Sequence, residues 1–270
     1  DTGSAAQKEK REMKEKLEKI YSQYNCREMV DPDPLLYLYD YPDVREREIA
    51  GLIAACLAYG QVRQIMKAVK SILEKMGPSP RDYVLQRSDR EMAADFKGFV
   101  YRFARASHVV ALFRGVRQVL KRFSSLEDCF CRGLQTDRDT VISGLVFLCR
   151  RLDPDKTTGH LLADPSKSSA CKRSHLYLRW MVRSDAVDPG GWDQVSPSLL
   201  VIPVDRHMHR AGHLLGFTRR KAADLKTALE ITAGFRRLVP DDPVKYDFCL
   251  TRYGIRDELN LEQLREKVAI

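Results

Sequence analysis

The sequence predicts an all-α protein folded as two helical lobes, because every long apolar pattern in it has the period of a helix. Apolar residues recur three and four positions apart in each of these segments, which places them on one face of a helix. The one run typical of a strand, residues 199–202, is short and leads directly into Pro203. The sequence shows neither a series of alternating strands nor an internal repeat, so we expect helices packed on helices.

Helices are expected in the following order along the chain. Residues 49–57 and 62–76 come first, and the second of these segments stops at Gly77-Pro78, a pair that ends helices. Residues 109–123 and 141–152 follow, the latter ending at Asp153-Pro154. The remaining helices are expected over residues 170–183, 206–215, 220–238 and 243–253, and Asp242 before Pro243 is a favourable start for the last of them.

The chain has 270 residues, which is enough for a domain of two lobes with a substantial core. We expect residues 1–10 to form a leader or disordered tail and residues 11–270 to form one domain. Within it, residues 46–202 make a central lobe, and residues 11–45 with 203–270 make the second. The polar segment 153–169 joins two helices, and a loop of this length in a helical domain is often functional.

The positive charge of the chain is localised. The formal net charge is +9, yet residues 96–126 hold seven basic residues and no acidic one, and residues 166–184 hold five and again no acidic one. Such concentration is expected of a surface that follows the phosphates of a nucleic acid. Two solvated helix faces are the alternative explanation.

The cysteines and the apolar runs bear on the compartment. Seven cysteines, an odd number in a long chain, fit no disulfide framework, which indicates a reducing environment. No apolar run reaches membrane-spanning length, and no signal peptide is visible. We therefore expect a cytoplasmic protein without a membrane partner.

Asp205 stands where a helix is expected to begin, directly after an apolar run. An aspartate in that position needs no role beyond capping the helix. The stretch around it, Ile-Pro-Val-Asp-Arg-His-Met-His-Arg-Ala over residues 202–211, resembles the segment of the helix-hairpin-helix DNA glycosylases in which an aspartate is catalytic. The resemblance is nearest to the 8-oxoguanine branch of that superfamily, and it makes Asp205 the predicted catalytic carboxylate.

Four further segments resemble the bacterial family DUF2400, and the likeness extends roughly from Asp31 to Ile255. They are residues 57–61, 169–183, 188–192 and 242–248. The family is similar in turn to the archaeal 8-oxoguanine glycosylases, in which a Schiff-base lysine precedes the catalytic aspartate by a comparable stretch of chain. Lys172 lies 33 residues before Asp205, so the resemblance makes Lys172 the predicted nucleophile. A phosphate-binding or solvated lysine is the alternative.

The resemblance implies a helix-hairpin-helix fold with a modified hairpin and an enzyme of base-excision repair. The expected activity is a glycosylase with AP-lyase activity on oxidised purine, in which Asp205 stabilises positive charge on C1′ and Lys172 forms a Schiff base. We expect no cofactor, a partner that is double-stranded DNA with a damaged base, a monomeric state and association with the nucleoid. A non-catalytic nucleic-acid-binding protein and a helical protein–protein scaffold remain as alternatives.

Other residues are candidates for holding the DNA. Gln61 is the candidate wedge that fills the space left by an extruded base, although it could simply be a helix-terminal turn residue. The candidates for base contact are three aromatic residues and a histidine, which could instead belong to the core: Trp180, Trp192, Tyr246 and His175. The candidates for contact with the DNA backbone are basic: Arg102, Arg105, Arg114, Arg117, Lys167 and Arg173.

Two cofactor classes are not expected. His207, His209 and His213 are close in sequence, but only two of them share a helix face, and no carboxylate completes a zinc set. An iron–sulfur cluster of the endonuclease III kind needs four cysteines after the catalytic aspartate, and only Cys249 follows Asp205. The Gly-rich hairpin of the wider superfamily is also absent before Lys172, so the loop over residues 158–169 is expected to replace it.

Overall fold

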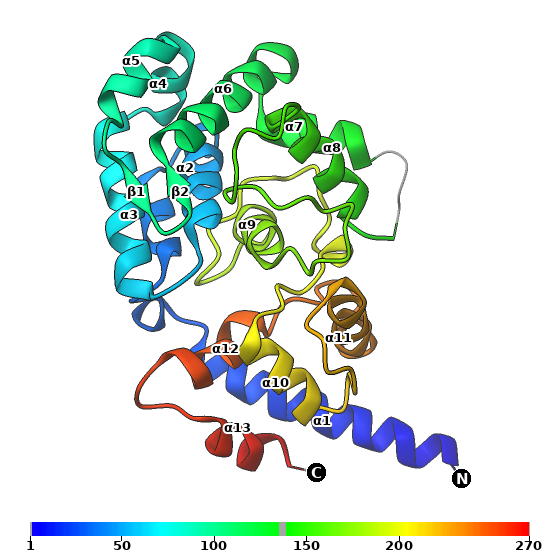
Figure 1. Cartoon of the computed structure of the whole chain (residues 1–270). Helices are drawn as coiled ribbons and strands as arrows, with labels where there is room; N and C mark the ends of the chain where they lie inside the picture. The colour runs from blue at the N-terminus through cyan, green and yellow to red at the C-terminus, as the bar shows by residue number, and fades with distance from the viewer. Residues whose placement is uncertain (1, 135–138, 270) are drawn as a thin grey trace.

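The structure is a computed structural model that describes residues 2–134 and 139–269, and its regular secondary structure is helical apart from one short hairpin (Figure 1). The first α-helices are α1 (Thr2–Tyr24), α2 (Val44–Leu57), α3 (Val62–Met76), α4 (Pro80–Gln86), α5 (Asp89–Asp95), α6 (Ala106–Phe123) and α7 (Leu126–Leu134). They are followed by α8 (Ile142–Leu152), α9 (Lys172–Val182), α10 (Arg206–Leu214), α11 (Leu225–Leu238), α12 (Asp247–Ile255) and α13 (Leu261–Val268). Three 3₁₀ helices complete the description: η1 (Arg27–Met29), η2 (Pro34–Asp40) and η3 (Pro197–Leu199).

The all-α prediction is confirmed, and the helices expected from periodicity are present with shifted ends. Helix α11 begins at Leu225 rather than near residue 220, because the side chain of Asp224 accepts the hydrogen bond of Thr227 N and caps the helix there. Helix α12 begins at Asp247, after a turn that contains Pro243. Residues 2–10, which were expected to belong to a leader or disordered tail, are helical and form the start of α1.

The only strands in the described part of the chain are β1 (Val100–Tyr101) and β2 (Ala104–Arg105), which pair antiparallel as a two-residue hairpin. Arg102, in its turn, has a φ of 50°, a conformation that non-glycine residues adopt uncommonly. The run 199–202 forms no strand. Leu199 ends η3 and is partly buried. Residues 200–202 continue in an extended course and are buried, and the backbone N–H of Ile202 bonds to the Thr232 hydroxyl.

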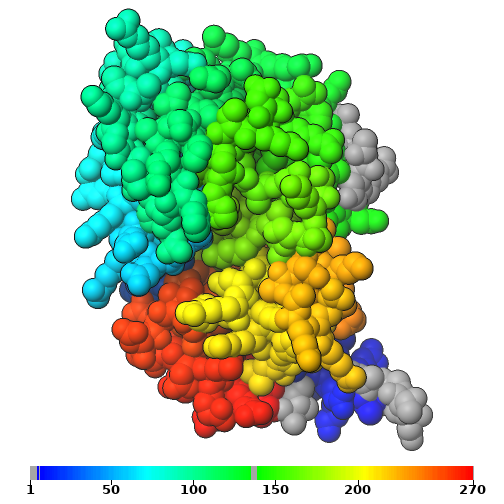
Figure 2. Space-filling view, viewed as in Figure 1, coloured from blue at the N-terminus to red at the C-terminus, as the bar shows by residue number. Residues whose placement is uncertain are grey.

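The helices form two groups, with α2–α9 in one and α1 with α10–α13 in the other (Figure 1). Helix η2 packs on α2 and α3, so residues 34–40 lie with the first group rather than with the second lobe, to which they were assigned from the sequence. The space-filling view shows a surface that is hollowed where the two groups meet, beside the residues of α10 (Figure 2).

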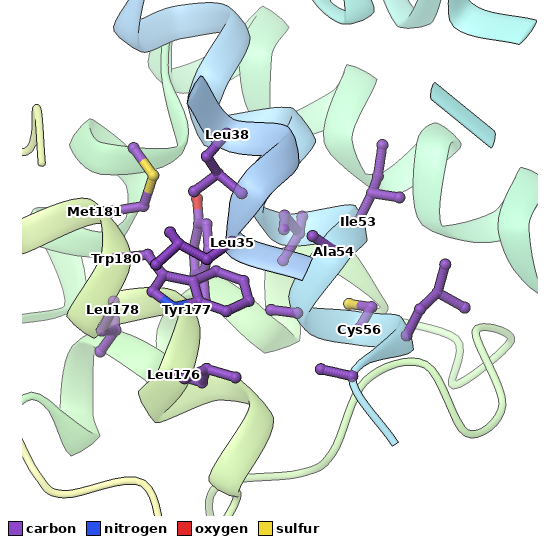
Figure 3. Close-up of a cluster of buried hydrophobic side chains, with 14 of the residues drawn as sticks. Leu35, Leu38, Ile53, Ala54, Cys56, Leu176, Tyr177, Leu178, Trp180 and Met181 are labelled. Atoms are coloured by element: carbon purple, nitrogen blue, oxygen red, sulfur yellow. The ribbon is translucent and has the colours of Figure 1, made fainter. Parts of the chain in front are cut away.

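The core of the first group is built around α2, which is enclosed by η2 on one side and α9 on another (Figure 3). All residues of α2 from Glu48 to Leu57 are buried, as are Tyr177, Trp180 and Met181 of α9. Gly51 permits this approach, because a Cβ there would lie 3.1 Å from a Leu38 methyl group. The packing holds α9, and therefore its first residue, in a fixed position.

A network of buried ion pairs joins the two groups. Arg179 of α9 pairs with Asp188, at 3.1 Å between Nε and Oδ1, and with Asp247 of α12. Arg183 pairs with Asp188 and, at 3.0 Å, with Asp242 in the turn before α12. The guanidinium groups of both arginines are almost fully buried. These two members of the basic stretch 166–184 are therefore neutralised inside the protein and do not face a polyanion.

Candidate active site

Asp205 is the N-cap residue of α10, as its place after the apolar run predicted. Its Oδ1 accepts hydrogen bonds from the backbone N–H groups of His207 and Met208, at 2.8 and 2.9 Å. The four residues before it, 201–204, are buried and fix the entry of the chain into the helix. The capping role thus uses one carboxylate oxygen and leaves Oδ2 for another partner.

Lys172 is the first residue of α9, directly after a residue with an unusual backbone conformation. Cys171 precedes the helix in the left-handed region, with φ and ψ both 42°. Such conformations cost free energy for residues with a side chain and cluster at functional sites. The buried turn sets the direction in which Lys172 leaves the backbone.

Lys172 and Asp205 face each other across the junction of α9 and α10. The Nζ of Lys172 lies 4.0 Å from Oδ2 of Asp205, and the two side chains are 31% and 25% exposed. The oxygen that faces the amine is the one that the cap leaves free. An amine and a carboxylate are therefore held close together by the beginnings of two helices, and both side chains remain partly exposed to solvent.

The loop over residues 153–171 is ordered by its own side chains and by Arg173. Asp153 accepts hydrogen bonds from the backbone N–H groups of Thr157 and Thr158. Arg173 donates to the carbonyls of His160 at 2.6 Å, Leu161 at 3.1 Å and Cys56. Arg173 thus joins the loop to the end of α2. This structural role differs from its predicted role in DNA contact.

The loop also reaches the second group of helices. Ser169 forms an isolated β-bridge with Asp224, and the backbone N–H of Leu225 bonds to the Ser168 carbonyl at 2.9 Å. The segment that carries Lys172 is therefore fixed to the beginning of α11 as well as to α2.

The predicted DNA contacts fall into two sets. Arg102, Arg105 and Lys167 are exposed, and so is Gln61, which begins α3 as its N-cap residue rather than ending the apolar helix. Arg114 is paired with Asp89 at 2.8 Å.

Arg117 is largely buried and is held in place by oxygen acceptors on three residues. It bonds to Asp89 at 3.0 Å and to the carbonyls of Val84 and Arg87. Arg117 therefore stabilises the packing of α6 on α4 and α5. The prediction that Arg117 contacts DNA phosphates is corrected, because its guanidinium is bonded to groups within the protein.

The four predicted base contacts are core residues in this structure, and none offers a ring to solvent. Trp180 is 0% exposed, Trp192 and Tyr246 are 1% exposed, and His175 is 2% exposed. The Nε1 of Trp192 donates to Glu48, a buried carboxylate of α2. The assignment of base stacking to these side chains is therefore corrected: the three aromatic side chains bury large apolar surface in the core, and His175 is buried with them.

Burial of His175 carries a pH dependence that can be measured. Burial lowers the pKa of His175 to about 4, while an unfolded histidine titrates near 6.5. The stability that neutral His175 contributes is therefore present above pH 6.5 and is lost as the pH falls toward 4. Between pH 7 and pH 5, we expect wild type to lose about 2 kcal/mol more unfolding free energy than His175→Leu, measured by urea denaturation. Equal losses in both proteins would contradict this.

Asp247 is a buried carboxylate near the pair that the sequence did not single out. It is 2% exposed, and burial raises its pKa to about 6, with the negative charge of Asp205 acting in the same direction and Lys172 opposing it. One of its oxygens pairs with Arg179, and the other has no hydrogen-bond partner. The motif of residues 242–248 contained this residue, but nothing in the sequence set it apart from the other aspartates.

Two further features lie outside the pair. An apolar pocket between α2, α8 and the loop 153–171 adjoins Arg173 and Ser174, and Lys172 does not line it. On α10, the Nε2 atoms of His209 and His213 both lie within 2.9 Å of the Arg220 carbonyl. These histidines therefore fasten α10 to the chain that follows it.

The fold and the site define an all-helical protein in which a lysine and an aspartate, each at the beginning of a helix, face each other at a junction of two groups of helices. The chain belongs to the family described as protein of unknown function DUF2400, which it matches over residues 33–256. Comparison with curated proteins found no match, and comparison with solved structures found none either. Within residues 2–134 and 139–269, no helix combines the length and the apolar character needed to cross a membrane.

Proposed function

We propose that this protein is a DNA glycosylase with AP-lyase activity that acts on damaged duplex DNA, with oxidised purine of the 8-oxoguanine type as the substrate class. The observation that carries the proposal is the approach of Lys172 Nζ to Asp205 Oδ2, at 4.0 Å, with both side chains partly exposed. Cleavage of an N-glycosidic bond with Schiff-base formation needs an amine and a carboxylate side by side.

The two residues have separate tasks in the proposed reaction. In its neutral form, Lys172 uses the lone pair of Nζ to form a bond to C1′ while the bond from C1′ to the base breaks. The base leaves with the electron pair of that bond and takes up the proton that the attacking amine loses. The carboxylate of Asp205 offsets the positive charge that develops on the sugar in this step. Opening of the sugar gives the Schiff base, and loss of a proton from C2′ then expels the 3′ phosphate.

Exposed cations on the loop before Lys172 and on the β1–β2 hairpin are suited to hold the phosphates of the substrate. Lys167 lies in the loop that leads to Lys172, and Arg102 and Arg105 lie on the β1–β2 hairpin. Binding through such contacts weakens as salt concentration rises, because each neutralised phosphate releases condensed counterions. Arg114 and Arg117 are poor tests of this surface, since reversing their charge would also break their bonds to Asp89.

The experiment that tests the proposal is borohydride trapping on duplexes that carry 8-oxoguanine, a natural abasic site or no damage. We expect a covalent protein–DNA product with the first two and none with undamaged DNA, because borohydride reduces the Schiff base to a stable amine. Absence of a trapped product with the abasic duplex, under salt conditions where the protein binds it, would exclude the lyase.

A further inference from the structure

The β1–β2 hairpin presents an aromatic side chain to solvent. Phe103, in the turn, is 62% exposed, and Val100 on the same hairpin is 60% exposed. Elsewhere in the described chain the large apolar side chains are at least partly covered, apart from Leu261 of α13, which is 40% exposed. Leaving a phenylalanine in water forgoes the gain from burying it, about 1.5–3 kcal/mol. This exposure therefore calls for an explanation outside the stability of the fold.

The hairpin is held rigidly at its base. The hydroxyl of Tyr101 bonds to the Tyr59 carbonyl at the end of α2, and the two rings are in contact, with their centroids 5.1 Å apart. Behind the turn, Arg102 lies against Gly60, where an added Cβ would come within 3.0 Å of its side chain. The tip is thus fixed beside Gly60-Gln61, the turn between α2 and α3 that carries the candidate wedge.

Phe103 is connected to the proposed active site through the loop 153–171. Its ring packs edge-on against His160, with the centroids 5.2 Å apart. The carbonyl of His160 accepts a hydrogen bond from Arg173, which follows Lys172 in α9. Partial burial lowers the pKa of His160, and the charges of Arg173 and Arg102 act in the same direction, which favours a neutral ring for the contact.

The charged residues that lie near the hairpin tip in the sequence are all basic. Arg102 and Arg105 flank Phe103 and are exposed, Lys97 lies just before the hairpin, and residues 96–126 contain no acidic side chain. An apolar side chain flanked in sequence by exposed cations matches a duplex, whose backbone is anionic and whose base stack is apolar. Side chains of this kind open base steps and kink the duplex in other DNA-binding proteins.

We propose that Phe103 inserts into the base stack of the duplex beside the extruded nucleotide, with Arg102 and Arg105 on the adjacent phosphates. This inference rests on the proposed glycosylase function and assigns the wedge to the hairpin tip. Gln61, which is polar and lies next to the tip, is then left to contact the bases exposed by the opening.

The inference is tested with a duplex that holds a tetrahydrofuran abasic analogue and a 2-aminopurine at the neighbouring position. Wild type should raise the 2-aminopurine fluorescence as the base unstacks, and Phe103→Ala should lose most of that rise and bind about tenfold more weakly, the scale of one lost base–aromatic contact. Phe103→Trp should restore both signals, and Leu261→Ala, which removes an exposed apolar side chain on α13, should match wild type.

The outcomes separate this inference from the proposed function. If Phe103→Ala unstacks the base and binds as wild type does, while wild type is trapped on a natural abasic duplex, the wedge is refuted and the glycosylase stands. If wild type neither binds the duplex nor is trapped, both are refuted. A defect of Phe103→Ala that is equally large on single-stranded DNA, where no stack has to be opened, would also overturn the wedge.

Discussion

Asp205→Asn is expected to lower the rate of base release by about 100-fold or more, the scale of a lost electrostatic contact in a transition state. The substitution keeps the oxygen that accepts from His207 and Met208, and asparagine caps helices as well as aspartate does. It removes the charge that faces Lys172. Single-turnover excision from an 8-oxoguanine duplex measures the effect, and the melting temperature should stay close to that of wild type.

Asp205→Ala is the comparison that separates capping from catalysis. It removes the cap as well as the charge and is expected to cost about 1 kcal/mol of stability in addition to the loss of activity. If Asp205→Asn lowers the melting temperature and leaves excision unchanged, Asp205 is a cap and the catalytic assignment is wrong.

Lys172→Gln should abolish borohydride trapping and strand cleavage while leaving DNA binding nearly intact. Glutamine keeps a polar side chain of similar length but has no amine to form a Schiff base. The matched control is Lys226→Gln, an exposed lysine in the first turn of α11 that should be trapped as wild type is. Trapping that persists in Lys172→Gln and vanishes in Lys226→Gln would move the nucleophile to α11.

Helical periodicity predicted the main helices because it records which side chains a helix buries. The stripes of α3 and α6 are clear for that reason, since each of these helices buries one face. Helices α4 and α5 have seven residues each and are defined by the caps Ser79 and Ser88 rather than by a long stripe. The β1–β2 hairpin has strands of two residues, too short for an alternating pattern to appear.

The candidate site could be predicted in part. Local sequence places Asp205 and Lys172 each at the beginning of a helix. The distance between their side chains, however, depends on how α9 and α10 pack. Sequence could not tell a phosphate-binding arginine from one that ties the chain together, because both are basic residues in an acid-poor stretch. Arg173 and Arg179 have structural roles because they bond to carbonyls and aspartates that are distant in sequence.

Arg179→Met is expected to lower the unfolding free energy by about 3–5 kcal/mol, because it disrupts the network of buried ion pairs beneath Lys172 and Asp205. The guanidinium of Arg179 is 3% exposed, and its partners Asp188 and Asp247 are as deeply buried. Asp188 retains Arg183 when Arg179 is removed. Asp247 has no second ion-pair partner among the described residues, so the substitution leaves its carboxylate buried and uncompensated.

A charge-compensating double variant tests that explanation. Arg179→Met with Asp247→Asn removes the stranded charge and should recover a large part of the lost stability, measured by urea denaturation. Lys70→Met is the control for losing a cation, because its pair with Glu74 is exposed and such pairs contribute at most about 0.5 kcal/mol. A loss below about 1 kcal/mol in Arg179→Met, or no recovery in the double variant, would contradict an uncompensated charge as the cause. Since the network joins α9 to α12 beneath Lys172, excision should fall with stability and return with it.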